Sequence, residues 1–284
     1  MIRGLYTGSS GMMAQWNNIN VISNNLANVN TSGYKKDISV FKSFPEMLMR
    51  RLYDDGVVNF NLGSYDKAPV IGKMGTGVEF NDVYTDFDQG LSIRRTENDL
   101  DIALVGKGFF TVETDRGHRY TRNGSFTLDE NSYLVTQQGY KVLGENGPIQ
   151  IKNNNFRVDE QGVITRNSKY NRELSEFVDK EENSFDYEEV VDRLKIVTFN
   201  DLRGLKKEGE SLYVETPQSG KMTELSMDNG RPKVVQGYIE TSNVNVVNQM
   251  VKMIETQRAY EANQKTVQTS DELMGIISNR IGRI

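Results

Sequence analysis

The sequence contains no cysteine, and this absence removes several classes of function. Neither a disulfide framework nor a thiolate site for zinc or an iron–sulfur cluster is possible without cysteine. The chain also has a single histidine, His118, so a His-rich metal site or a Ser-His-Asp triad is poorly supported. We expect His118 to be a solvated residue of a charged turn, and we expect no metal site.

Long apolar runs and phosphate-binding loops are also missing. No apolar stretch approaches the roughly 18 residues that a membrane span needs, and glycines, serines and amides interrupt the N-terminal segment, so a cleavable secretory signal is not expected. The net charge of −5, without a basic patch, argues against nucleic acid as a partner. Gly72, Gly75 and Gly77 have the wrong spacing for a dinucleotide fingerprint. We therefore expect no cofactor.

Asp99 and Asp101 form the one carboxylate pair that merits comparison with a glycoside hydrolase. Residues two apart in a strand lie on the same face. That face is opposite Leu100, Ile102 and Leu104, which predict a half-buried strand, so solvent exposure explains both carboxylates. We expect no catalytic residues and no enzymatic activity.

The first 35 residues carry a seven-residue repeat that is typical of a coiled-coil-like helix. The turn chemistry of Thr31, Ser32 and Gly33 then ends the helix. Gly4, Gly8 and Gly11 weaken such a helix by about 1 kcal/mol each relative to alanine, so it needs packing partners. The repeat positions, six of them apolar, are Ile2, Leu5, Ser9, Met12, Trp16, Ile19, Ser23 and Leu26.

A second long helix is predicted from about Val244 to Ile281, with a length of roughly 57 Å at 1.5 Å per residue. We expect the two chain ends to pair with each other and with copies of themselves; the alternative is two ordinary helices that pack only on their own domain. The repeat has an apolar row and a mostly polar row, namely Val246, Met253, Tyr260, Val267, Met274 and Ile281, and Gln249, Thr256, Asn263, Ser270 and Ile277.

Asn20, Asn24 and Asn28 recur every four residues and therefore form one ridge on the first helix. Asparagine is a poor helix former because its side chain competes for backbone hydrogen bonds. We expect these amides, like Gln257 and Asn263, to hydrogen-bond between packed helices. The alternative is a solvated face.

The period changes from helical to alternating between the two ends, which predicts an all-β region. The dipeptide Asn123-Gly124 predicts a hairpin turn. The segment 46–52, after Pro45, is a predicted short helix. Residues 169–192 hold nine acidic and three basic side chains, a local net charge of −6, and predict a solvated excursion.

The two ends resemble the signatures of the bacterial flagellar basal-body rod and hook proteins. The N-terminal signature corresponds to residues 23–35, SNNLANVNTSGYK, and the C-terminal one to 240–245, ETSNVN, and 253–263, MIETQRAYEAN. Residues 98–103, 106–110 and 120–126 are similar to the family in the β region. The start, MIRGLYT, and residues 43–48, SFPEML, look most like the proximal-rod branch.

The resemblance implies an α+β fold, with a discontinuous helical domain from residues 1–35 and 238–284. A connector at 36–80 and a β-rich outer domain at 81–237 would complete it. It also implies a structural subunit of the rod that self-assembles into a helical tube and transmits torque. The partners would be copies of itself, other axial proteins and the flagellar export apparatus, with ring proteins or peptidoglycan as further candidates. The location would be the periplasm-spanning basal body, reached without a cleaved signal peptide.

The residues that we expect to carry self-assembly come from both signatures and both repeats. Two alternatives stay open within the family, the distal rod and the hook. A third, of another class, is a glycan-binding or hydrolase β module with helical oligomerisation ends. The expected assembly residues are Leu5, Met12, Trp16, Ile19, Asn24, Asn25, Leu26, Asn28, Gly33, Tyr34, Val246, Met253, Ile254, Tyr260, Asn263, Val267, Met274, Ile277 and Ile281.

Overall fold

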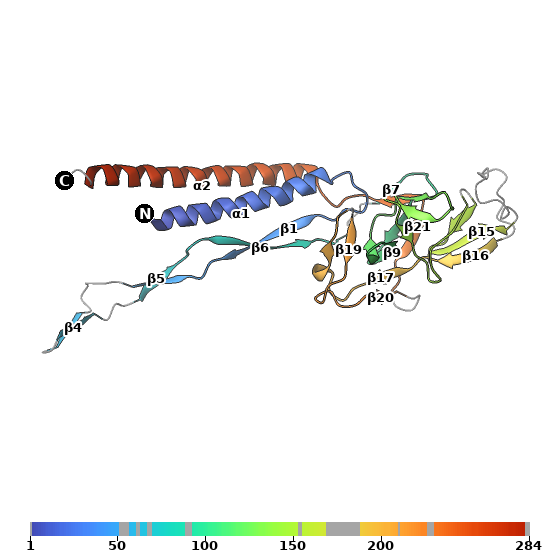
Figure 1. Cartoon of the computed structure of the whole chain (residues 1–284), viewed down its shortest axis with the longest axis horizontal. Coiled ribbons are helices and arrows are strands. Elements are labelled where there is room, and N and C mark those ends of the chain that lie inside the picture. The colour runs from blue at the N-terminus through green and yellow to red at the C-terminus, as the bar shows by residue number, and fades with distance from the viewer. Residues whose placement is uncertain are drawn as a thin grey trace. The chain divides into compact units, whose positions relative to one another are not determined.

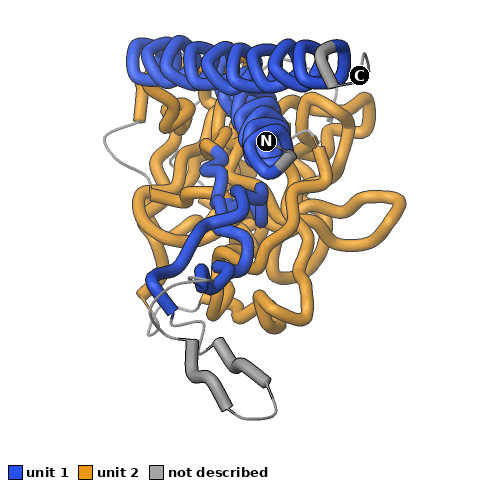
Figure 2. Tube along the Cα trace, turned by 90° about the vertical axis from the view of Figure 1, so that its left-hand side faces the viewer, with its two compact units in different colours: residues 1–26, 37–84, 246–284 blue, residues 27–36, 85–245 orange. Residues whose placement is uncertain are grey.

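The computed structural model describes residues 2–50, 57–60, 63–66, 70–88, 93–152, 155–168, 188–209, 211–225 and 230–281. The chain forms two compact units, each built from separate stretches of sequence (Figure 2). The helix–hairpin unit comprises residues 1–26, 37–84 and 246–284, and the β unit comprises residues 27–36 and 85–245.

Two long helices from opposite ends of the chain lie side by side in the helix–hairpin unit (Figure 1). They are α1 (Ile2–Ala27) and α2 (Val246–Ile281). The rings of Trp16 and Tyr260 meet at 6.5 Å between centroids, so the expected pairing of the two ends is confirmed. Neither helix, over the residues described, has the length and apolar character needed to cross a membrane.

The rest of this unit is one interrupted antiparallel hairpin (Figure 1). Its strand pairs are nested in sequence, so the outermost pair begins and ends the segment. The first three strands of the chain form one arm, and the next three return along it. The pairs are β1 (Asp37–Ser43) with β6 (Val78–Thr85), β2 (Met47–Arg50) with β5 (Val70–Met74), and β3 (Val57–Phe60) with β4 (Gly63–Asp66).

The helix predicted after Pro45 is wrong, because residues 47–50 form strand β2. Met47 lies opposite Met74, and Leu48 lies opposite Lys73. Leucine, methionine and arginine favour helix in isolation, but the backbone pairing with β5 overrides this weak local preference. Pro45 precedes the strand, where its missing N–H interrupts no ladder.

A nine-stranded antiparallel sheet is the main element of the β unit. Strand β9 is central, because it pairs with β10, β13 and β17. The path runs β11-β12-β13-β9-β10-β19-β18, and β20 joins through β17. The strands are β9 (Phe109–Thr114), β10 (Gly117–Thr121), β11 (Phe126–Leu128), β12 (Leu134–Thr136), β13 (Lys141–Val142), β17 (Ile196–Thr198), β18 (Lys206–Lys207), β19 (Leu212–Val214) and β20 (Thr223–Glu224).

Three smaller sheets complete the β unit. A short 3-10 helix, η2 (Leu202–Gly204), precedes β18 and is capped by the Asp201 side chain. The exposed His118 lies on β10 opposite Glu113, just past the β9–β10 turn. The smaller sheets pair β7 (Ile93–Arg95) with β22 (Tyr238–Glu240), β8 (Ile102–Val105) with β21 (Lys233–Gln236), and β14 (Phe156–Val158) with β15 (Val163–Asn167) and β16 (Glu188–Arg193).

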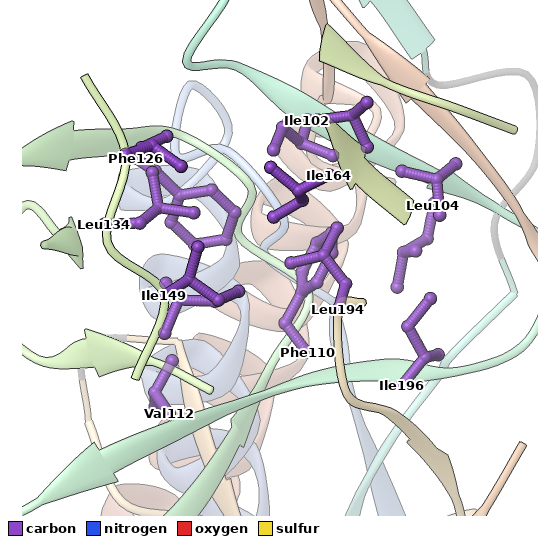
Figure 3. Packing of buried hydrophobic residues seen from close by; sticks show 14 of the residues in the cluster. Ile102, Leu104, Phe110, Val112, Phe126, Leu134, Ile149, Ile164, Leu194 and Ile196 are labelled. Carbon is purple, nitrogen blue, oxygen red and sulfur yellow. The ribbon is translucent and has the colours of Figure 1, made fainter. Parts of the chain in front are cut away.

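Buried apolar side chains of the β unit form two clusters, and in the larger one Phe110 and Phe126 pack edge to face (Figure 3). Strand β8 is not half-buried as predicted, since Ile102, Ala103 and Leu104 are all buried in succession. Both of its faces are therefore covered, which a short apolar run cannot reveal by itself.

The predicted hairpin turn at Asn123-Gly124 is also wrong, because β10 and β11 do not pair with each other. Instead, the Gly124 carbonyl accepts a hydrogen bond from the Ile102 amide at 2.9 Å. A Cβ on Gly124 would lie 1.7 Å from the Ile102 carbonyl oxygen. The glycine is thus required for a close backbone approach to β8 rather than for a two-residue turn.

Candidate assembly interface

Small residues on α1 allow a close approach to α2. A Cβ on Gly8 would lie 2.9 Å from Val267 Cγ2, and one on Gly11 would lie 2.7 Å from Asn263 Nδ2. The α1 face that meets α2 is therefore the glycine row, about one position away from the predicted apolar seam. Trp16, at the centre of that seam, is 57% exposed. The seam prediction for α1 missed this because glycines count against a helix by propensity alone.

Helix α2 turns both of its predicted rows inward. Among the side chains that the structure describes, every α2 residue that is not exposed belongs to these rows, apart from Ala259. The two most buried are polar, Gln249 and Thr256. Asn18 Nδ2 of α1 donates to Thr256 Oγ1 at 3.2 Å, so the polar row makes a hydrogen bond between the helices.

The amides that join α1 to its neighbours lie on a different face of the helix from the predicted ridge. Asn20 and Asn24 are exposed, whereas Asn18 makes the interhelical bond just described. The buried Asn25 donates to the Asp37 carbonyl and accepts from the Asp37 amide, both at 2.8 Å. Asn18 Oδ1 also accepts from Ser39 Oγ at 2.7 Å, so these amides join α1 to strand β1 as well as to α2.

The expected assembly residues fall into three groups by exposure. Trp16, Asn24 and Ile254 are exposed, and the side chain of Ile281 lies outside the described residues. Asn25, Gly33 and Tyr34 are buried. The half-buried residues are Leu5, Met12, Ile19, Leu26, Asn28, Val246, Met253, Tyr260, Asn263, Val267, Met274 and Ile277. Their part in assembly stays a prediction.

An apolar stripe on the opposite side of α2 was missed in the sequence. Val247, Met250, Val251 and Ile254 are between 49% and 69% exposed. Their spacing of three and four residues places them on one face of the helix. We call these four residues the α2 stripe. The spacing of these four residues is visible in the sequence, but the prediction was based on the seven-residue rows, which lie on the other face of the helix.

The hairpin also exposes apolar side chains. Met47, Leu48 and Met49 of β2 are exposed in succession, as are Val70 and Ile71 of β5. Adjacent residues in a strand point to opposite faces, so neither face of this ribbon is covered within the unit. We call these five residues the hairpin patch.

A groove of about 550 Å³ adjoins the hairpin patch. Met47 and Met74 line it from the hairpin, Tyr6 and Thr7 from α1, and Thr266 from α2. It is thus formed by all three parts of the helix–hairpin unit, and mostly apolar surface faces into it.

The end of the N-terminal signature is buried in the β unit. Gly33 has φ = +68°, and its amide donates to the Glu240 carbonyl at 2.7 Å. A Cβ there would lie 2.5 Å from the Asn123 amide nitrogen. The Lys207 ammonium lies 4.2 Å above the Tyr34 ring. Gly33 was predicted as a helix terminator, and the close backbone contact is an additional reason for glycine.

Among the described residues, the other sequence candidates form no second site. Asp101 is buried rather than solvated as predicted, because its backbone is held between Asn98 and Gly237. Residues 169–187 of the acidic segment lie outside the described residues, and Glu188, Glu189 and Asp192 lie on β16. No group of three acidic or histidine side chains suited to a metal occurs among the described residues.

The structure thus has three features: its two chain ends are paired as helices, those helices and the hairpin expose apolar surface, and a second unit is built from β-strands. These features are typical of a protein that presents extended surfaces to partners. Three family models match the same parts: flagella basal body rod protein over 5–35, flagellar hook protein FlgE/F/G D1 domain over 103–166, and flagellar basal body rod FlgEFG protein C-terminal over 235–280.

Full-length relatives agree. Flagellar basal-body rod protein FlgG of Buchnera aphidicola subsp. Schizaphis graminum is 36% identical, over 98% of this chain and 99% of the relative. FlgG of Borreliella burgdorferi is 34% identical over 98% of each. Flagellar hook-basal body complex protein FlhO of Bacillus subtilis is 32% identical over 100% of each. The chain belongs to the family of flagellar basal-body rod proteins, so the resemblance of its two ends is confirmed.

Proposed function

We propose that this chain, a structural subunit of the bacterial flagellar basal-body rod, works by polymerising through its helix–hairpin unit. The observation that carries this proposal is the α2 stripe, together with the hairpin patch. An apolar stripe on a helix that already has a partner on its other face calls for a second partner. An isolated two-stranded ribbon is also marginally stable in water.

The partner that we propose is another copy of this chain or a related axial subunit. A heterologous contact between identical subunits that does not close on itself propagates into a helical array. The result would be a tube that transmits torque, with the β unit outside it. Catalysis has no part in this function. The FlgG relatives are named as rod proteins, which supports a rod position over a hook position. The proximal end of the rod remains our proposal.

We also propose that the subunit reaches the basal body through the flagellar export apparatus and retains α1. The support is physical, since α1 supplies the glycine row that α2 contacts and the amides that hold β1. Removal of an N-terminal leader would remove part of this interface. Mass spectrometry of the subunit in purified basal bodies should therefore find peptides that include Arg3 to Met12.

The decisive experiment replaces residues of the α2 stripe in the full chain. The double variant Val251→Asp/Ile254→Asp places two charges in the stripe, and the control Lys252→Asp places one on a neighbouring exposed position. Both lie near the start of α2, so effects of aspartate on the helix dipole are matched. We expect the double variant to form no rods in electron micrographs of basal bodies, whereas the control forms them.

Near-UV circular dichroism of each purified variant keeps assembly separate from folding. The β unit should give an unchanged spectrum in both. Rods of normal length from the double variant would refute polymerisation through this stripe. The rival glycan module predicts that the full chain binds or degrades peptidoglycan. We expect that purified sacculi incubated with the chain bind none of it and are not cleaved.

A further inference from the structure

Three charged side chains from three distant segments meet in the interior of the β unit. Lys35 comes from the N-terminal signature, Arg122 from the end of β10, and Glu240 from the end of β22. Their side chains are 0%, 4% and 1% exposed. Charged residues are almost never buried to this extent unless they are paired, so the cluster has to be understood as one arrangement.

A single carboxylate serves both cations. Glu240 Oε1 accepts from Lys35 Nζ at 2.6 Å and from Arg122 Nη2 at 3.3 Å, and Oε2 accepts from Arg122 Nε at 2.9 Å. Arg122 Nη1 also donates to the carbonyls of Gly106 and Gly108, at 2.8 and 2.6 Å. Burial lowers the pKa of Lys35, and the negative charge of Glu240 opposes that shift. The cluster thus holds two positive charges and one negative charge.

The two terminal segments are bound around this cluster. We call residues 27–36 the N-segment and residues 238–245 the C-segment. The Gly33 amide donates to the Glu240 carbonyl at 2.7 Å, and the Lys36 amide donates to Asn243 Oδ1 at 2.8 Å. Lys36 also forms an ion pair with Asp86 at 3.1 Å. The N-segment therefore lies against a surface that the C-segment partly forms.

Removing each segment in turn leaves very different charges behind. If the N-segment leaves, Glu240 and Arg122 remain as a neutral pair. If the C-segment leaves, Lys35 and Arg122 lose the carboxylate that hydrogen-bonds to both, and Asp86, which already pairs with Lys36, is left to oppose the charge of Lys35. Breaking a buried pair by removal of one partner is strongly unfavourable, because a charge is left uncompensated. The C-segment can thus dock alone, whereas the N-segment cannot.

We propose that Glu240 is a latch that makes docking of the N-segment conditional on prior docking of the C-segment. The order is a property of a single chain, and it does not depend on polymerisation. It ensures that the two ends of the chain are held at the β unit together, never the N-terminal end alone. Lys35 and Arg122 act here as positioning residues whose charges enforce the order.

Hydrogen exchange of the full-length monomer tests the order, with Glu240→Gln, Lys35→Met and the double variant. Glu160→Gln is the control, since its ion pair with Lys233 is exposed. Glu240→Gln should speed exchange of the N-segment by about a hundredfold or more. In the Lys35→Met background the N-segment brings no cation to the cluster, so the same substitution should change exchange of the N-segment by less than about fivefold.

Lys35→Met alone should leave exchange of the C-segment unchanged, because the pair between Glu240 and Arg122 persists. Peptides of β9 report whether the core stays folded. If Glu240→Gln does not fold, Lys35→Met still decides, since acceleration of both segments would show mutual docking and overturn the order. An equal effect of Glu240→Gln in both backgrounds would also overturn it, as would a wild-type N-segment that exchanges like an unfolded chain.

Discussion

Gly8 of α1 and Val267 of α2 approach so closely that a single added methyl group would leave 2.9 Å between carbon atoms. This contact explains why α1 contains glycines although glycine has a low helix propensity. At Gly4 the neighbour is farther, with Ser270 Oγ 3.9 Å from a Cβ built there. Gly4 therefore has room for alanine, whereas Gly8, like Gly11, does not.

These two positions give a matched test of helix packing. Gly4→Ala should be neutral or raise the stability of the helix pair by up to about 1 kcal/mol, because alanine is the better helix former. Gly8→Ala gains the same propensity but should lower stability by about 1–3 kcal/mol through overpacking against Val267. Thermal unfolding followed by far-UV circular dichroism measures both.

A compensating change completes that test. Val267→Ala removes the Cγ2 atom that a Cβ on Gly8 would meet, so Gly8→Ala should cost less in the Val267→Ala background than in the wild type. Equal costs in the two backgrounds, or identical melting of Gly4→Ala and Gly8→Ala, would show that this contact does not set the helix spacing.

The sequence was sufficient for the two terminal helices, but not for the face that each presents. The seven-residue rows of α2 predicted its inward side correctly, down to the buried Gln249 and Thr256. In α1 the strongest apolar pattern includes the largely exposed Trp16, yet the backbone of α1 comes closest to α2 at Gly8 and Gly11. An apolar pattern is defined by the side chains that are present, whereas the close packing of α1 on α2 depends on glycines, which have no side chain.

The hairpin patch should be needed for incorporation into rods. Leu48→Glu/Ile71→Glu places charges on both strands of the ribbon, while Arg50→Glu changes the charge at an exposed polar position of the same strand. We expect the double variant to be reduced at least about tenfold in purified basal bodies, since burying two charges without partners is unfavourable. Quantitative immunoblotting measures this.

The melting temperature of the β unit is the internal control for that experiment, and it should be the same in all three proteins. Incorporation of the double variant at the wild-type level would mean that the patch faces solvent in the rod. A loss with Arg50→Glu as well would point to charge rather than apolar contact.

A comparison of Gly33 with Gly139 measures the cost of a left-handed backbone conformation apart from the cost of steric crowding. Both have positive φ, +68° and +89°, but only Gly33 lies against another backbone, whereas a Cβ on Gly139 would meet nothing within 4 Å. Gly139→Ala should therefore cost about 1–2 kcal/mol for the left-handed conformation alone. Gly33→Ala should cost at least about 3 kcal/mol, because Asn123 has to move. Urea unfolding of the full chain gives both values, and equal costs would contradict the crowding argument.

Sequence reasoning failed where segments distant in the chain meet. Asn123-Gly124 has the composition of a hairpin turn, but the Gly124 carbonyl accepts a hydrogen bond from the Ile102 amide instead. The segment after Pro45 has helix-forming residues, but β5 pairs with it. Lys35 and Glu240 are separated by 205 positions, and nothing in the local pattern around either indicates that they form an ion pair. Local composition predicts local structure, and these contacts are decided by long-range pairing.

Tyr120 predicts how the stability of the β unit changes at alkaline pH. Its ring packs edge to face with Phe199 at 4.8 Å between centroids. Burial, with a smaller contribution from the charge of Glu215, raises the pKa of Tyr120 from 10.0 to about 12. Between these values the unfolded chain has lost the phenol proton and the folded chain has kept it. The unfolded state therefore binds fewer protons, so the free energy of unfolding falls as pH rises through this window.

Tyr120→Phe removes that dependence while keeping most of the ring packing. Urea midpoints at pH 9, 10 and 11 should fall more steeply in the wild type than in Tyr120→Phe. Burial also lowers the pKa of Lys35, and that shift raises stability with pH because the unfolded chain holds the proton longer. Lys35 is present in both proteins, so its effect cancels in the difference between them. Parallel slopes for the two proteins would mean that Tyr120 titrates in the folded state as it does in the unfolded chain.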